Sequence, residues 1–179
     1  MIADRLSGQR IAVTGATGFV GTALVERLLR AVPGCEVVVL VRNGRRTSAA
    51  DRVRKEILKN NAFDRLRREL GADFDATMSR RLSVVAGDVG TDGLGLNEAD
   101  RETFASCDVI IHSAASVSFD SPLDSAVEVN LLGPTRIANL LNEHGPRAEA
   151  TSLRQFNPMS NGPALTNSSG AVPRRLPAT

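Results

Sequence analysis

The feature that most constrains the fold is a glycine-rich turn between two apolar segments, at residues 10–29 (RIAVTGATGFVGTALVERLL). The run RIAVTG is typical of a short buried strand. From Phe19 to Val32 apolar residues recur at helical spacing, and Pro33 and Gly34 end the predicted helix. A strand, a tight turn and a helix in this order predict the first half of a βαβ unit.

Three glycines punctuate this turn, namely Gly15, Gly18 and Gly21. We expect Gly15 to let the chain leave the strand in a tight turn, Gly18 to leave room for a pyrophosphate, and Gly21 to let the helix lie close to the sheet. A helix that begins near Phe19 offers free N–H groups and the positive end of its dipole to a phosphate. The turn therefore predicts dinucleotide binding, and the alternative is a purely structural turn.

Strand-like and helix-like segments alternate along the chain up to residue 144. The apolar run EVVVLVR at residues 36–42 is typical of a strand in a parallel sheet covered on both faces. A break is expected near Asn60 and Asn61, and a kink at Pro134. The alternation predicts an α/β, Rossmann-like doubly wound parallel sheet. Its other predicted elements are strands at residues 81–89 and 108–116, and helices at residues 48–70, 97–107 and 122–144.

Residues 145–179 break this alternation. They hold five of the chain's eight prolines and no strand-like apolar run, which is the composition of a disordered or unrelated tail. We therefore predict an NAD(P)-binding Rossmann domain over residues 1–144, truncated after about four strands and followed by an irregular tail. A fourth strand without a neighbour exposes unpaired backbone groups, so its edge is a candidate docking surface for a partner chain.

Composition and charge limit the partners and the location. The formal net charge of +2 does not indicate a nucleic-acid partner. There is no run of about 18 apolar residues, so no integral membrane segment is predicted. The charged letters ADR near the N-terminus are unlike a signal peptide, and a cytoplasmic location is expected. Cys35 and Cys107 are predicted to be separate buried apolar residues rather than a disulfide or metal pair.

The second predicted strand ends in Arg42, with Arg45 and Arg46 close behind it. At this place a cofactor with a free ribose 2′-hydroxyl prefers an acidic residue, whereas a planar guanidinium suits a 2′-phosphate. The sequence therefore predicts NADPH as the cofactor. The alternative is a solvated cluster of arginines in a loop.

Several segments together carry a more specific resemblance, among them TGATGFVG, VVAGDV and HSAASVSFDSPLDSAVEVNLLG. They resemble the N-terminal part of fatty acyl-CoA reductases, which are extended short-chain dehydrogenases of the male-sterility and thioester-reductase type. The resemblance implies cofactor contacts from Thr17, Gly18 and Phe19 on the pyrophosphate, Arg42 on the 2′-phosphate, Asp88 and Val89 beside the adenine, and Ser113, Ala114 and Ala115 along the nicotinamide-side ribose. The alternative for Asp88 is an acidic residue that only caps a turn. The alternative for the segment at Ser113 is a set of small residues that only allow close packing.

Two polar residues in this part of the chain receive weaker predictions. His112 is expected to be a structural strand residue rather than a catalyst. The resemblance gives Asn130 the part of a helix asparagine that shapes the site, and a satisfied polar group of the core is the alternative.

The resemblance also implies a reaction, the NADPH-dependent reduction of fatty acyl-CoA thioesters. In that family a tyrosine beyond the fourth strand donates the proton, and a lysine four residues later lowers its pKa. The chain contains no tyrosine, and its lysines are Lys55 and Lys59. No catalytic or metal-binding residue is therefore assigned. We expect the chain alone to be inactive, as an NADPH-binding fragment, as a half-subunit completed by a separate chain, or as a product without function.

Overall fold

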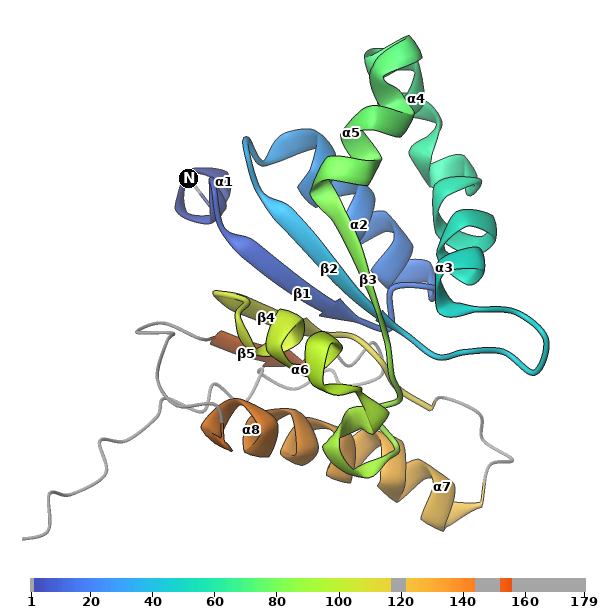
Figure 1. Cartoon of the computed structure of the whole chain (residues 1–179), viewed down its shortest axis with the longest axis vertical. Helices are drawn as coiled ribbons and strands as arrows, with labels where there is room; N and C mark the ends of the chain where they lie inside the picture. Colours follow the sequence, from blue (N-terminus) through green and yellow to red (C-terminus); the bar gives the residue numbers. More distant parts are fainter. Residues whose placement is uncertain (1, 117–121, 144–151, 156–179) are drawn as a thin grey trace, which may run out of the picture.

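The computed structural model describes residues 2–116, 122–143 and 152–155. Its centre is a parallel sheet with helices on both faces (Figure 1). The strands lie in the order β3-β2-β1-β4-β5. This order, in which the chain returns to the other side of the first strand, confirms the Rossmann-like doubly wound fold. The strand bounds are β1 Arg10–Thr14, β2 Glu36–Val41, β3 Leu82–Ala86, β4 Val109–His112 and β5 Ser152–Gln155.

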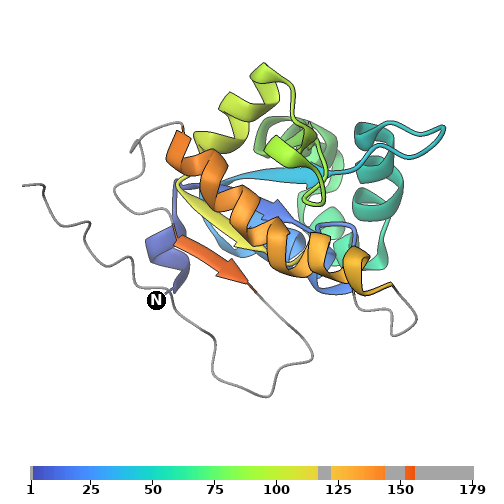
Figure 2. The same ribbon diagram turned by 90° about the horizontal axis from the view of Figure 1, so that it is seen from below.

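Helices connect these strands and cover the sheet. The α-helices are α1 Ile2–Leu6, α2 Phe19–Ala31, α3 Ala49–Arg52, α4 Asp64–Leu70, α5 Phe74–Arg81, α6 Glu98–Ala105, α7 Leu123–Val127 and α8 Gly133–Glu143. Two described segments wind as π-helix, η1 Val53–Leu58 and η5 Glu128–Leu132. Short 3₁₀ turns are η2 Asn61–Phe63, η3 Gly71–Asp73 and η4 Asp92–Gly95. Figure 2 shows α7, η5 and α8 following one another along the sheet.

The core has two layers because adjacent residues of each strand face opposite sides of the sheet. On one face Ile11 and Val13 pack with α2 and with the helices between β2 and β3. On the other face Ala12 packs with buried residues of α6 and α8, such as Phe104 and Ile137. Apolar side chains on both faces explain why β2 has a continuous apolar sequence rather than an alternating one.

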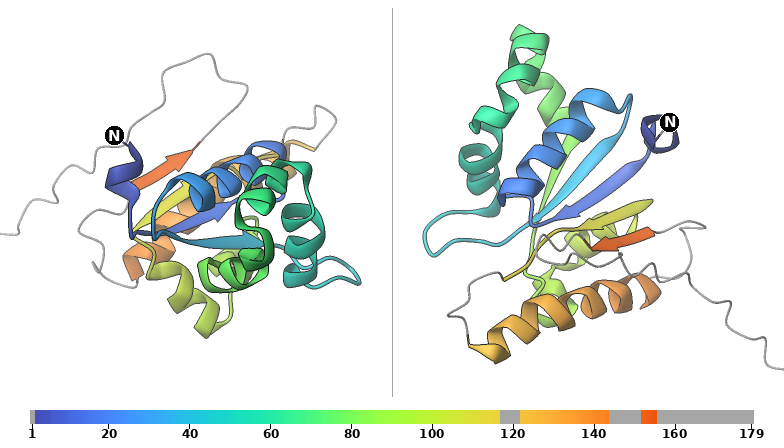
Figure 3. Two further views of the ribbon diagram at one scale, coloured as in Figure 1. Left: turned by 90° about the horizontal axis from the view of Figure 1, so that it is seen from above. Right: turned by 180° about the vertical axis from the view of Figure 1, so that it is seen from behind.

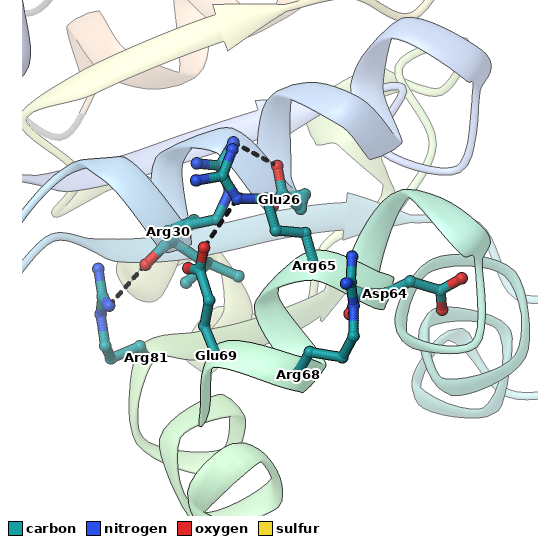
Figure 4. A network of polar contacts seen from close by, with 8 residues as sticks. Glu26, Arg30, Asp64, Arg65, Arg68, Glu69 and Arg81 are labelled. Atoms are coloured by element: carbon teal, nitrogen blue, oxygen red, sulfur yellow. Dashed lines mark hydrogen bonds and ion pairs between the residues drawn. The ribbon is translucent and has the colours of Figure 1, made fainter. Parts of the chain in front are cut away.

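The helices between β2 and β3 are anchored to α2 through arginines (Figure 4). Arg81, the last residue of α5, donates hydrogen bonds to the carbonyls of Leu29 and Val32 at 2.7 and 2.9 Å. Such a cation at the carboxyl end of a helix satisfies free carbonyls and interacts favourably with the helix dipole. The Glu26–Arg30 ion pair of α2 faces the charged side chains of α4 in the same view.

The predicted break near Asn60 and Asn61 is confirmed. Helix η1 ends at Leu58, and Asn60 Oδ1 then accepts the N–H of Ala62 at 2.9 Å to begin η2. An asparagine side chain that bonds the backbone in this way competes with helix continuation. The sequence pattern does not predict helix α5, which follows in the same connection between β2 and β3. Phe74 is one of its buried residues.

The predicted kink at Pro134 takes the form of a local change in helical winding. Pro134 is the second residue of α8, and α8 directly follows the π-helix η5. Proline lacks the N–H that would bond the carbonyl four residues earlier, and a π-turn lets the helix continue past this point. The buried residues of this long helix, Gly133, Ile137 and Leu140, all lie in α8.

The sequence predicts no strand after residue 144, and this prediction is wrong. Strand β5 pairs in parallel with β4, with Val109 beside Ser152 and His112 beside Gln155 (Figure 2). Strand β4 is therefore an interior strand, and the expected docking of a partner chain on its free edge loses its basis. The segment SLRQ has one apolar residue, so hydrophobic periodicity misses a strand that pairs through backbone groups. The rest of the predicted tail lies outside the described residues.

Candidate functional site

A cavity of about 480 Å³ opens at the carboxyl ends of β1 to β4. Open α/β sheets bind ligands at this edge, beside the point where the strand order reverses. Figure 3 shows the long loop after β2 extending from the same edge. Phe19 and Gly21 are predicted site residues that do not line the cavity. The other predicted residues do line it, namely Gly15, Thr17, Gly18, Arg42, Asp88, Val89, Ser113, Ala114 and Ala115.

Gly15 carries two constraints at once. Its φ of +70° lies in the left-handed region that side chains disfavour. A Cβ at this position would also lie 2.5 Å from the nitrogen of Ala114 and 2.6 Å from the carbonyl carbon of Ser113. Glycine therefore serves both the tight turn, as expected from the sequence, and the close approach of the segment after β4, which the sequence does not predict.

Gly21 keeps the first turn of α2 close to the glycine turn itself. A Cβ at Gly21 would collide with the carbonyl oxygen of Gly15 and lie 2.8 Å from Cα of Ala16. The hydroxyl of Thr22 donates to the carbonyl of Ala16 at 2.9 Å and holds the same contact. Glycine is thus required at position 21 because the helix contacts the backbone of the turn. The sequence predicts a contact between the helix and the sheet instead.

Gly18 forms the amino-terminal cap of α2 without a side chain. Its N–H donates to the carbonyl of Gly15 at 3.0 Å, and its carbonyl accepts the N–H of Thr22 at 2.9 Å. Phe19 follows with 94% of its surface exposed. The first N–H groups of a helix have no partner within it, and they carry the positive end of the dipole. A glycine cap at a helix amino terminus fits a pyrophosphate.

Asp88 makes the turn-capping contact that the sequence analysis gives as its alternative role, and it also lies at the cavity. It lines the cavity, and its Oδ1 caps a turn by accepting the N–H of Gly90 at 2.9 Å. Its own N–H donates to the carbonyl of Leu94 at 2.7 Å. Its second carboxylate oxygen lies 3.7 Å from a guanidinium nitrogen of Arg42. Arg42 and Asp88 therefore face each other across the mouth of the cavity.

Arg52 is a cavity residue that the sequence analysis misses. Its Nη1 donates to the carbonyl of Arg42 at 2.9 Å, and its Nε and Nη2 donate to the two carboxylate oxygens of Glu56 at 2.8 and 2.9 Å. The hydrogen bonds to Glu56 raise the pKa of the Arg52 guanidinium. Arg45 and Arg46, which lie nearer than Arg52 to Arg42 in the sequence, are exposed and do not line the cavity.

The segment after β4 is held from both sides. Ser113 Oγ donates to the carbonyl of Thr14 at 2.8 Å. On the other side Asn130 of η5 accepts the N–H of Ser116 at 2.7 Å and donates to the carbonyl of Ser116 at 2.9 Å. Asn130 thus shapes the site by fixing backbone, as the resemblance implies. Val129, its neighbour on the same π-turn, lines the cavity.

His112 is fully buried and does not line the cavity. Its Nδ1 and the hydroxyl oxygen of Thr14 share a hydrogen bond of 2.7 Å. Burial lowers the pKa of the imidazole from 6.5 to about 4, so the ring is neutral at neutral pH. Burial likewise raises the pKa of the free Cys107 thiol to about 12. No group of three or more metal-ligating side chains occurs among the described residues.

Comparison with known proteins agrees with this geometry. The sequence profile of the family described as male sterility protein matches residues 13–167. The chain belongs to this family. It therefore carries the family's NAD(P)-binding domain, and the matched range includes the strand β5.

Named relatives place the family among the reductases. The chain is 37% identical over 138 residues to fatty acyl-CoA reductase 1 of Rattus norvegicus, covering 76% of this chain and 26% of the relative. It is 34% identical over 136 residues to fatty acyl-CoA reductase 1 of Arabidopsis thaliana, covering 74% of this chain and 28% of the relative. The chain thus spans about a quarter of the length of these curated relatives.

Solved structures show the same fold. The terminal R domain from the myxalamid PKS-NRPS biosynthetic pathway shares 29% sequence identity at a TM-score of 0.61, over 83% of this chain and 34% of that one.

Among the helices that the structure describes, none is long and apolar enough to cross a membrane.

Proposed function

We propose that this chain forms the NADPH-binding part of a fatty acyl-CoA reductase. The observation that carries the proposal is the placement of Arg42 at the mouth of a cavity whose base is the glycine turn. The turn supplies helix N–H groups for a pyrophosphate, and the guanidinium supplies charge for a ribose 2′-phosphate. Residues 1–144 are proposed as this binding domain, with strand β5 at Ser152–Gln155 as a further strand of its sheet.

Each part of the cavity then has a role in holding the cofactor. Thr17 and Gly18 hold the pyrophosphate at the amino terminus of α2, and Val89 borders the adenine together with Asp88. The segment after β4 borders the nicotinamide-side ribose, and Asn130 keeps that segment in place. When bound, NADPH supplies a hydride. Fatty acyl-CoA is the proposed acceptor because relatives of the chain are fatty acyl-CoA reductases.

We further propose that these 179 residues bind NADPH without oxidising it. The family's acid is a tyrosine, and the sequence has none. His112 does not replace it, because the ring is neutral, buried and away from the cavity. The two buried free thiols, Cys35 and Cys107, fit a reducing compartment, so a cytoplasmic location is part of the proposal.

The test compares thermal unfolding with NADPH and with NADH at equal concentrations. At about 100 times its dissociation constant, NADPH stabilises the native state by about 2.7 kcal/mol, a rise of roughly 5–10 °C in melting temperature. NADH is expected to give a smaller rise. Equal rises, or none, would contradict the 2′-phosphate assignment. In a second arm NADPH absorbance is followed after addition of palmitoyl-CoA, and steady oxidation would show that a proton donor exists in this chain.

A further inference from the structure

A second cavity, of about 740 Å³, lies among the helices that connect β2 and β3. It shares no lining residue with the cavity at the carboxyl ends of the strands. Helices α3 and α5 both contact β3, which is the outermost strand on this side of the sheet (Figure 1). Small-molecule sites usually have volumes of about 300–1,000 Å³, so this cavity has room for a ligand of its own.

Apolar side chains form much of the lining of this cavity. Phe74 and Met78 line it from α5 and Val53 lines it from η1, and all three belong to the buried core. Leu82 and Val84 share one face of β3 and also line the cavity, but they are only half-buried. An apolar group placed against these two side chains would remove more of their surface from water, which stabilises the contact.

The winding of η1 brings apolar and cationic residues to the same cavity. A π-helix bonds each residue to the fifth residue along the chain, whereas in an α-helix residues five apart point about 140° away from each other. Val53 and Leu58 are five apart, as are Arg54 and Lys59, and all four line the cavity. An α-helical reading of the sequence does not predict this grouping.

Arg67 closes the cavity on the side of α4. One terminal nitrogen of its guanidinium donates to Asp64 at 2.6 Å, and the other donates to the carbonyl of Leu58. Its guanidinium carbon lies 5.3 Å from the centroid of the Phe74 ring, within the range of a cation–π contact. Arg67 thus joins α4 to η1 and α5, and its charge is already balanced by Asp64.

The remaining charges of the lining leave one cation free. Arg54 is paired with Asp51 at 3.3 Å. Lys59, the carboxyl-terminal cap of η1, is exposed and has no hydrogen-bond or ion-pair partner among the described residues. Asp75 is the acidic residue of the lining, against three cations. A lining with an excess of positive charge favours an anionic ligand.

We propose that this cavity binds an amphipathic anion, namely a long aliphatic chain that ends in a carboxylate. The chain lies against the apolar lining from α5 and β3, and the carboxylate pairs with the ammonium of Lys59. No residue of the cofactor cavity takes part, so this inference goes beyond the proposed NADPH function and does not depend on it.

The experiment measures displacement of a fluorescent fatty acid, cis-parinaric acid, from the full chain at ligand concentrations below micelle formation. Palmitate is expected to displace the probe with a dissociation constant in the micromolar range. Hexadecan-1-ol has the same chain without the charge and should bind about fivefold or more weakly. Octanoate has eight fewer CH₂ groups and should bind about tenfold or more weakly. No displacement by palmitate, or equal displacement by hexadecan-1-ol, would overturn the proposal.

Two variants place the ligand in this cavity. Lys59→Gln should weaken palmitate about fivefold or more and leave hexadecan-1-ol within about twofold. Val84→Phe fills the cavity and should weaken both ligands about tenfold or more. If Val84→Phe does not fold, Ser79→Trp replaces it, because Ser79 lines the cavity from an exposed position on α5. Unchanged palmitate affinity in the charge variant and in the filled variant would place the ligand elsewhere and overturn the proposal.

The matched control is Lys55→Gln. Lys55 is an exposed lysine of the same helix η1 and does not line the cavity, so its replacement should leave the affinities for palmitate and hexadecan-1-ol unchanged. An equal loss of palmitate binding in Lys55→Gln and Lys59→Gln would show unspecific attraction to a basic surface and would overturn the proposal. The rise in melting temperature with NADPH is measured on every protein as a separate readout. Its absence in the wild-type chain would refute the proposed function without touching this cavity.

Discussion

Acidification should weaken this fold through one buried imidazole. His112 has no exposed surface, and its Nδ1 bonds the hydroxyl of Thr14 at 2.7 Å. No hydrogen-bond partner of its Nε2 occurs among the described residues. A proton added to this ring would place a charge in the apolar layer between the sheet and α8, where desolvation is costly. Burial accordingly lowers the pKa of His112 from 6.5 to about 4.

This shift fixes the sign of the effect. Between pH 6.5 and about pH 4 the unfolded chain binds a proton on His112 that the native chain does not bind. The free energy of unfolding therefore has its full value above pH 6.5 and falls as the pH drops towards 4. The loss from this group reaches about 3 kcal/mol, since one pKa unit corresponds to about 1.4 kcal/mol. Total stabilities of about 5–15 kcal/mol make such a loss easy to measure.

The assay is urea unfolding of the wild-type chain and of His112→Asn at a series of pH values. Asparagine keeps a polar group beside Thr14 and does not titrate. The carboxylates titrate in both proteins, so their contribution cancels in the difference between the two free energies of unfolding. That difference should change by about 3 kcal/mol between neutral pH and pH 4, or roughly 6–12 °C in melting temperature. Parallel stability curves over this range would refute a buried neutral histidine.

Three further substitutions test the site. Gly21→Ala should cost roughly 1–3 kcal/mol of stability in urea unfolding, because its Cβ meets the carbonyl of Gly15; an unchanged midpoint would count against this close contact. Asn130→Ala removes both hydrogen bonds to Ser116 and should lower the free energy of unfolding by about 1–3 kcal/mol. It should also weaken NADPH binding in calorimetry; unchanged binding would show that the segment after β4 keeps its position without Asn130. Asp88→Asn frees its arginine partner and should raise the NADPH to NADH affinity ratio by up to about fivefold at unchanged stability. An unchanged ratio would show that the ion pair does not compete with the 2′-phosphate.

Features that depend on local backbone geometry can be predicted from the sequence. Gly15 is an example, because a tight turn after a strand requires a left-handed residue. The break at Asn60 is another, because a short amide side chain bonds the backbone within two residues. Most predicted site residues reach one cavity because the carboxyl ends of parallel strands share one edge of the sheet.

Features that depend on pairing or packing between distant segments escape such prediction. Strand β5 pairs through its backbone, and its sequence lacks a hydrophobic period. Arg52 enters the site because loop hydrogen bonds set the start of α3, whereas charge clustering in the sequence points to Arg45 and Arg46. The contact of Gly15 with the segment after β4 joins residues about a hundred positions apart, and only the assembled sheet reveals it.

The most direct test of the account is a crystal structure of the chain grown with saturating NADPH. The cofactor is expected in the cavity at the carboxyl ends of β1 to β4. Its pyrophosphate should lie within hydrogen-bond distance of the backbone N–H groups around Gly18, and its 2′-phosphate against Arg42. An empty cavity at saturating cofactor, or NADPH bound at another surface, would contradict the account.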